Sequence, residues 1–276
     1  MDKIYEPIAS FEEEWDKYTV KDVLAWNINH PHLIIIDSFL KKYFFNYKNH
    51  KIMMVDGGSG IGRLLVYYKQ KRYTIYGVES VYSAVKKAKN YDPSLPLIQA
   101  DLRRFPCIDN TYDVYLSEGV IEHDINGPDA ILQEAKRVLK KDGLLFISIP
   151  IQNNFYKVFK PFITFFRNIF IENIVRRILQ KPLIQKKEFH YYLYTKKEFE
   201  EAIKRNGFKI LFLEPTMHIA GIVKICPFFL NRMSNKDNTG NSIHFLNRLG
   251  RILYYCTKPF PWLFPNSCFI VAQKDE

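Results

Sequence analysis

The sequence predicts an α/β protein with a doubly wound, seven-stranded, mostly parallel sheet and helical lid insertions. Short apolar runs typical of β-strands alternate with helix-like stretches between Lys51 and Pro150. A glycine-rich segment follows the first of these runs, and a further apolar run ends the chain at Cys268–Gln273. Strict alternation of this kind is typical of parallel strands that are joined by crossover helices.

The first half of the chain supplies most of the predicted sheet. We predict strands at Ile52–Asp56, Thr74–Glu79, Leu97–Ala100, Tyr112–Ser117 and Gly143–Ile149. Helices are predicted between them, at Gly62–Lys69, Val81–Asn90 and Pro128–Lys140. Basic residues followed by a glycine commonly end a helix, and the segment Lys140–Gly143 has this composition.

Regular structure resumes after an aromatic and basic insert. Thr195 followed by Glu198 forms a capping-box pattern that predicts a helix to Asn206, and Gly207 then ends it. Strands are predicted at Phe208–Glu214 and at the C-terminal run. The expected organisation is therefore an N-terminal helical cap at 1–50, a core at 51–150, an insert at 151–194, and a completion of the sheet with a second insert at 195–276.

Composition narrows the class of protein. The chain has 276 residues and 47% hydrophobic content, which is enough for a sizeable core. Its beginning lacks the basic and apolar stretches of a secretory signal, so we expect a cytoplasmic location. The four cysteines lie far apart without CxxC spacing, which predicts neither a disulfide framework nor a metal site.

The net charge of +11 is concentrated in the insert. Between Ile151 and Lys187 eight basic residues stand against one acid, and they are interleaved with aromatic and aliphatic side chains. Such a segment fits a lid over an apolar acceptor, or a peripheral contact with an anionic inner-membrane surface. A further alternative, favoured over membrane contact, is that it packs against the C-terminal segment as the core of an acceptor domain with a solvated basic face. The segment Ile252–Gln273 carries only Lys258 as a charge, but its prolines argue against a membrane-spanning helix.

The glycine loop at Val55–Gly62 is the strongest motif. Gly58, Gly60 and Gly62 let a ligand approach the backbone where a strand ends and a helix begins. A nicotinamide or flavin fingerprint requires GxGxxG, but Arg63 stands at the third glycine position. The absence of a recognisable Tyr-x-x-x-Lys pair further disfavours a nicotinamide oxidoreductase.

Acidic residues follow three successive predicted strands. Asp56 precedes the glycine loop, Glu79 ends the second strand and Asp101 follows the third. A carboxylate at the second position can accept both ribose hydroxyls, and one at the third can accept from an adenine amine. Each acid alone has an ordinary explanation as a cap or turn residue, but together they predict a nucleoside site.

These motifs resemble those of class I S-adenosylmethionine-dependent methyltransferases, particularly the small-molecule group that includes the ubiquinone and menaquinone biosynthetic enzymes. The segments that carry the resemblance are the glycine loop, Phe105–Asp113, Ser117–His123, Glu134–Gly143 and, later, Tyr194–Pro215. The resemblance implies S-adenosylmethionine as the cofactor.

The resemblance also assigns roles. It implies that Asp56, Gly58 and Gly60 hold the methionine part of the cofactor, Glu79 the ribose, and Asp101 with Leu102 the adenine. Four neighbouring residues complete the expected cofactor site: Ser59, Gly62, Ser80 and Ser117. Gly57 departs from the family, which usually has an apolar side chain there, and this departure would loosen the packing of the loop.

Methyl transfer needs a positioned nucleophile and, for a hydroxyl acceptor, a base. His123 follows the fourth predicted strand, at the edge where open α/β sheets bind ligands, and an imidazole with a pKa of about 6.5 suits this role. An equal alternative is that His123 only packs over the cofactor or forms a hydrogen bond with the loop backbone. A helix around Trp15 and Tyr18 is expected to cover the site, with Trp15 lining the acceptor pocket or attaching that helix to the sheet.

We therefore predict methyl transfer to a small or lipid-like acceptor, at oxygen. A nucleic-acid acceptor is disfavoured, because Ser117–Val120 lacks the Pro-Pro-aromatic motif of amino-methylating DNA enzymes and Cys107 precedes the fourth strand. The alternative outside catalysis is a cofactor-binding accessory subunit or a membrane-associated scaffold.

Overall fold

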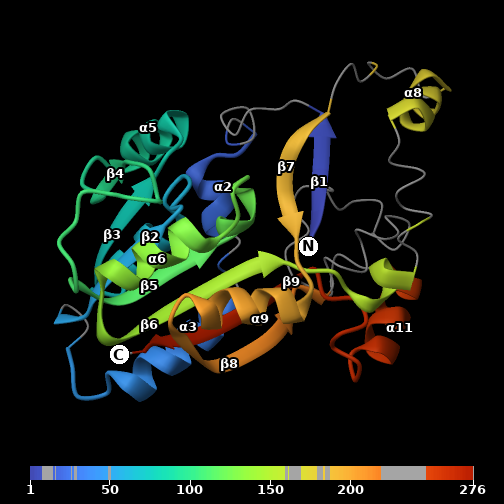
Figure 1. Cartoon of the computed structure of the whole chain (residues 1–276). Helices are drawn as coiled ribbons and strands as arrows, with labels where there is room; N and C mark the ends of the chain where they lie inside the picture. Colours follow the sequence, from blue (N-terminus) through green and yellow to red (C-terminus); the bar gives the residue numbers. More distant parts are fainter. Residues whose placement is uncertain are drawn as a thin grey trace.

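The computed structural model describes residues 1–7, 15, 17–25, 27, 30–48, 51–158, 161, 169–178, 183, 187–218 and 247–275. Its centre is a seven-stranded sheet in the order β4-β3-β2-β5-β6-β9-β8 (Figure 1). The strands are β2 (Met53–Gly57), β3 (Thr74–Glu79), β4 (Leu97–Gln99), β5 (Tyr112–Glu118), β6 (Leu139–Pro150), β8 (Phe208–Thr216) and β9 (Ser267–Lys274). Only β9 runs antiparallel to its neighbours in this sheet, so the predicted mostly parallel α/β fold is confirmed.

Helices cover both faces of this sheet (Figure 1). The helices α3 (Pro31–Tyr43) and α4 (Arg63–Gln70) pack on one face, together with α5 (Tyr82–Tyr91). The helices α6 (Asp129–Val138) and α9 (Lys196–Arg205) pack on the other. Each central strand is therefore buried on both sides. Its residues contribute alternately to the two cores: Met54 to one and Val55 to the other, for example.

Local sequence signals account for the helix boundaries in two places. The Thr195 hydroxyl accepts from the Glu198 amide, and the Glu198 carboxylate accepts from the Thr195 amide, which completes the predicted capping box of α9. The helix α6 ends at Val138, two residues earlier than predicted. Leu139 already pairs with Tyr112 of β5, so sheet pairing takes over before the basic residues are reached.

The N-terminal region differs from the helical cap that we predicted. Residues Asp2–Pro7 form β1, which pairs antiparallel with β7 (Lys187–Leu193) as a separate two-stranded ribbon. Figure 1 shows this ribbon beyond the end of the sheet toward which β6 points. The partner strand lies far along the chain, so no local pattern in the first residues could reveal the pairing. The same region also holds helices, α2 (Val20–Ala25) and α3.

The remaining described elements are η2 (Ile121–His123), α8 (Ile169–Ile178) and α11 (Arg248–Thr257). Parts of the aromatic and basic insert, at 159–160, 162–168, 179–182 and 184–186, lie outside the described residues, as do the remainder of the predicted helix around Trp15 and the position of Cys226. Among the described parts of the chain, no helix combines the length and apolar character needed to span a bilayer.

Candidate active site

The glycine loop turns sharply between β2 and α4. Gly58, Gly60 and Gly62 have φ angles of +86°, +51° and +86°, a region that side chains with a Cβ rarely adopt. A Cβ at Gly58 would lie 2.2 Å from Val120 Cγ2, and one at Gly60 would lie 2.4 Å from the Trp15 ring. The dihedral angles therefore favour glycine at all three positions, and close neighbours add a second reason at Gly58 and Gly60.

Glu79 joins the glycine loop to the next strand end. Its Oε2 accepts a hydrogen bond of 2.7 Å from the Gly60 amide. Its Oε1 accepts one of 2.9 Å from the Val81 amide, at the start of α5. One buried carboxylate thus holds two backbone segments at the carboxyl edge of the sheet, beside the space where a nucleoside would bind.

Asp56 is buried at the end of β2. Burial is the largest cause that raises its pKa, to about 7, and the nearby Glu118 carboxylate adds to this effect. Asp56 is therefore poised to ionise when a positive group arrives. Ser59 lies beneath it and donates through Oγ to the Asp56 carbonyl, at 2.7 Å. Ser117, at the end of β5, is also buried, and its Oγ has no hydrogen-bond partner within the described parts of the chain.

Asp101 follows β4 and is half exposed. Its carboxylate forms two hydrogen bonds with Nε of Arg103, at 3.0 and 3.1 Å, and one of 2.6 Å with Nη2. These hydrogen bonds lower the pKa of Asp101, so the carboxylate stays ionised and can accept further hydrogen bonds. Leu102 beside it is buried and offers an apolar surface.

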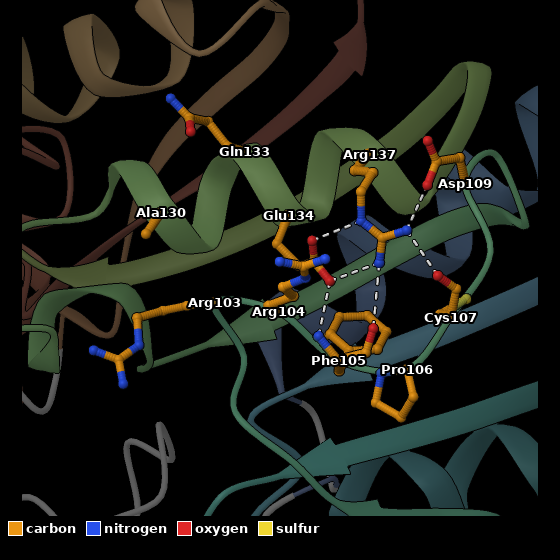
Figure 2. A pocket seen from close by; sticks show the side chains of 10 residues that line it. All are labelled: Arg103, Arg104, Phe105, Pro106, Cys107, Asp109, Ala130, Gln133, Glu134 and Arg137. Carbon is orange, nitrogen blue, oxygen red and sulfur yellow. Dashed lines mark hydrogen bonds and ion pairs between the residues drawn. The ribbon is translucent and has the colours of Figure 1, made fainter.

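The loop after β4 is fixed by two charged residues of α6. Figure 2 shows the Arg137 guanidinium among acceptors from this loop and from its own helix: it donates to the Cys107 carbonyl at 2.7 Å and to Asp109 at 2.5 Å. Glu134 Oε1 accepts from the Phe105 amide at 2.9 Å and pairs with Arg137 at 2.7 Å. This ion-paired clamp holds the segment that carries the predicted adenine contacts.

A cavity of about 850 Å³ opens at the carboxyl edge of the sheet. Five of the predicted cofactor residues line it: Gly58, Glu79, Ser80, Asp101 and Leu102. We call this space the strand-end cavity. Its wall also includes Trp15 and Tyr18, which approach from the N-terminal region as predicted, and His123. Lys87 of α5 donates to the Trp15 carbonyl at 2.8 Å and fixes this part of the wall. The other five predicted cofactor residues do not line this cavity: Asp56, Ser59, Gly60, Gly62 and Ser117.

A second cavity of about 420 Å³ shares Glu118, Gly119 and His123 with the first. We call it the histidine pocket, because four imidazoles and two carboxyl groups line it: His30, His32, His123, His190, Glu118 and Glu122. Of these residues, the sequence singled out only His123. The others come from α3, β5 and β7 and the segments next to them, and no sequence spacing connects them.

His123 is held by a backbone carbonyl. Its Nδ1 lies 2.7 Å from the His190 oxygen, and a carbonyl oxygen only accepts, so Nδ1 carries the proton and Nε2 is the basic nitrogen of the neutral ring. Nε2 lies 4.0 Å from Glu122 Oε1. Burial raises the pKa of Glu122 to about 8, so this carboxyl is protonated at neutral pH.

Glu118 lies at the centre of a polar network. It pairs with Arg63 through Oε2, and its Oε1 lies 2.9 Å from Nδ1 of His32. Burial would raise the pKa of Glu118, but Arg63 and His32 outweigh burial and hold the pKa well below its usual range. His30, beside this group, has a pKa lowered to about 3, chiefly by burial, and its ring is therefore neutral.

Comparisons with known proteins agree with this geometry. Residues 55–147 match the model of a methyltransferase domain family. The chain is 25% identical over 224 residues to an uncharacterized protein of Methanocaldococcus jannaschii, covering 80% of this chain and 83% of that protein.

Two solved structures share the fold. A Methanosarcina mazei S-adenosylmethionine-dependent methyltransferase superposes with a TM-score of 0.53 at 16% identity, over 84% of this chain and 97% of the other. An Archaeoglobus fulgidus S-adenosylmethionine-dependent methyltransferase gives 0.53 at 14% identity, over 96% and 98%. The two structures show that this chain has the same fold, and the domain match over residues 55–147 supports a methyltransferase that uses S-adenosylmethionine.

Proposed function

We propose that this enzyme methylates a hydroxyl oxygen of a small, polar acceptor that binds in the histidine pocket. The observation that carries the proposal is the position of His123, whose side chain lines both the strand-end cavity and the histidine pocket. A base at this junction can reach an acceptor in one cavity while the cofactor occupies the other.

The residues of the strand-end cavity fit S-adenosylmethionine. The glycine loop leaves no room for a Cβ, and Glu79 is anchored by two amides at the position expected for a ribose contact. We infer that Asp56 with Gly58 and Gly60 holds the methionine end, and that Asp101 and Leu102 hold the adenine. When bound, the cofactor supplies a methyl group on a positively charged sulfur.

His123 has the features of a general base. The His190 carbonyl fixes its tautomer, so Nε2 can take the proton of an acceptor hydroxyl while the oxygen forms its bond to the methyl carbon. Bound S-adenosylmethionine would give up its methyl group to that oxygen and leave as S-adenosylhomocysteine, and His123 would then release the proton to solvent. The Glu122 carboxyl, whose Oε1 lies 4.0 Å from Nε2, is protonated at neutral pH and so does not compete with the acceptor as a base.

The pocket favours a polar acceptor over an apolar one. Its described wall carries four imidazoles, two carboxyl groups and the side chains of Ser148, Asn266 and Ser267. Polar groups in a buried site are matched by polar groups of the ligand, because an unpaired partner loses its hydrogen bonds. Hydroxyl-rich acceptors such as sugars therefore fit this wall better than lipid-like phenols.

The test is a methyl-transfer assay with radiolabelled S-adenosylmethionine and a panel of sugars, hydroxy acids and lipid-like phenols. We expect transfer to a polar member, with kcat reduced by about 10²–10⁴-fold in His123→Ala. His190→Ala is a matched control, because it removes a neighbouring imidazole but keeps the backbone carbonyl that orients His123. Unchanged turnover in His123→Ala would remove the base role, and transfer to the phenols alone would contradict a polar acceptor.

A further inference from the structure

We propose that His30, His32 and Glu118 bind a divalent transition-metal ion of the zinc class at the edge of the histidine pocket. One ligand atom from each of the three side chains lies within 4.8 Å of the other two. Two imidazoles and one carboxylate are a donor set that suits zinc and its neighbours among the first-row metals. This group could not be predicted from the sequence, because Glu118 is 86 residues from His32.

The separation of two of the donors already matches a metal site. Nδ1 of His32 lies 2.9 Å from Oε1 of Glu118. Zinc binds nitrogen and carboxylate oxygen at about 2.0–2.2 Å, so adjacent ligands lie roughly 3 Å apart. An ion between these two atoms would replace their direct hydrogen bond without a large movement of either side chain. His30 must move closer to complete the three-sided site.

His30 supplies the feature that the hydrogen-bond network leaves unexplained. Its Nδ1 is buried and has no hydrogen-bond partner among the residues that the structure describes, whereas buried polar atoms are nearly always paired. The His30 and His32 ring centroids are 4.8 Å apart, with the ring planes at 76°, so the rings are close without being stacked. A metal ion would satisfy the unpaired nitrogen and would explain why a second imidazole lies beside the Glu118 pair.

The outer contacts orient the ligand atoms toward one point. Nε2 of His32 lies 2.8 Å from Thr216 Oγ1, which leaves Nδ1 for the ion. Arg63 forms an ion pair with Oε2 of Glu118, so Oε1 is the oxygen that can bind the ion. Such outer hydrogen bonds, here to two of the three ligands, are typical of metal sites. The positive charge of Arg63 weakens the attraction for any cation, so we expect the site to select tightly coordinated zinc-class ions over Mg²⁺.

All three ligands also line the histidine pocket, which contains His123. The open coordination positions of an ion would therefore face the space assigned to the acceptor. An acceptor oxygen on the ion would be held close to the base. This role rests on the proposed function, whereas metal binding itself does not.

The experiment is calorimetric titration of the full-length, chelator-treated protein with Zn²⁺ and with Mg²⁺, without cofactor or acceptor. We expect one Zn²⁺ per chain, no detectable Mg²⁺ binding, and a Zn²⁺ affinity at least about tenfold weaker in His30→Ala. His190→Ala is the matched control, because it removes an imidazole of the same pocket outside the proposed ligands, and it should bind Zn²⁺ like the parent protein. Equal circular dichroism spectra and thermal midpoints establish that each variant folds.

Three results would overturn the site: no Zn²⁺ binding by the parent protein, equal binding by His30→Ala, or equal losses in His30→Ala and His190→Ala. Co²⁺ provides a second readout, since its absorption spectrum reports the ligands directly. Imidazole and oxygen ligation is expected, and a thiolate-to-cobalt band would place the ion on a cysteine instead. Because no cofactor or acceptor is present, a negative result leaves the proposed methyl transfer standing, and failed methyl transfer leaves the metal site standing.

Discussion

The ring of Tyr115 occupies the space that a side chain at Gly57 would need. A Cβ at Gly57 would lie 2.2 Å from the Tyr115 hydroxyl oxygen and 2.6 Å from the ring carbon that carries it. The ring of Tyr115, from the neighbouring strand β5, thus fills the space that the family's apolar side chain at this position would otherwise fill. The loop is packed, and the loosening that we expected from the sequence is not needed to explain Gly57.

This relationship predicts compensation between the two positions. Gly57→Ala should lower the free energy of unfolding by about 1–3 kcal/mol, because the added methyl group overpacks the site. In a Tyr115→Val background the same substitution should lower the free energy of unfolding much less, because the tyrosine ring is absent. Urea unfolding of the two single variants and the double variant measures the coupling, and additive effects would show that Tyr115 does not fill this space.

Binding of S-adenosylhomocysteine should depend on pH through Asp56. Its raised pKa of about 7 means that the free carboxyl gains a proton as the pH falls below 7, whereas the bound ammonium group favours the ionised form. Affinity should therefore rise from pH 6 to pH 8, with a limiting slope of about tenfold per pH unit below the pKa. Calorimetry across this range tests the assignment. Asp56→Asn should bind more weakly with a flat profile, and an equally steep profile in that variant would assign the titration elsewhere.

Glu122 should make the fold less stable as the pH rises. The folded protein keeps the proton on Glu122 up to about pH 8, while an ordinary glutamate loses it at about 4.5. Between these values the unfolded chain binds fewer protons, so the free energy of unfolding falls with increasing pH. Glu122→Gln should remove this contribution and gain on the order of 1–3 kcal/mol relative to the parent between pH 5 and pH 8. Urea unfolding at both pH values measures the difference, and a gain that does not change with pH would contradict the buried, protonated carboxyl.

The Glu134 and Arg137 clamp should contribute to stability more than to cofactor chemistry. Arg137→Met should destabilise the fold by about 3–5 kcal/mol, because it leaves the buried Glu134 carboxylate without its ion pair. The double variant Glu134→Leu/Arg137→Met should lose less free energy of unfolding than Arg137→Met alone, because no unpaired carboxylate remains. Thermal unfolding of the three proteins tests this order. A double variant that is less stable than the single one would show that the loop contacts of the clamp dominate its ion pair.

The sheet was predictable because its signals are local. The strands β3 and β5 begin where the apolar runs begin, and the helix α9 begins at its capping box. Burial on both faces produces continuous apolar runs. Glycines at 58, 60 and 62 predict the sharp turn, because it needs dihedral angles that other residues avoid. The positions of Glu79 and Asp101 were also predictable, because both follow parallel strands whose carboxyl ends meet at one edge of the sheet.

The ribbon and the histidine pocket were not predictable in this way. The strand β1 pairs with a segment more than 180 residues away, and its few residues carry no pattern that separates a ribbon from a loop. His32 and Glu118 meet only after α3 packs against the end of β5, and Thr216 arrives from β8. These contacts depend on tertiary packing, so a single sequence gives no spacing rule for them.

We infer that the strand-end cavity binds the cofactor through Glu79. The most direct measurement is calorimetric titration of the parent protein and Glu79→Ala with S-adenosylhomocysteine, with Asp92→Ala as a control for loss of an acid outside the cavity. We expect micromolar binding by the parent and the control, and an affinity about 10–100-fold weaker in Glu79→Ala, the amount expected for lost hydrogen bonds to a charged group. Equal affinity in a correctly folded Glu79→Ala variant would contradict the account and place the cofactor elsewhere.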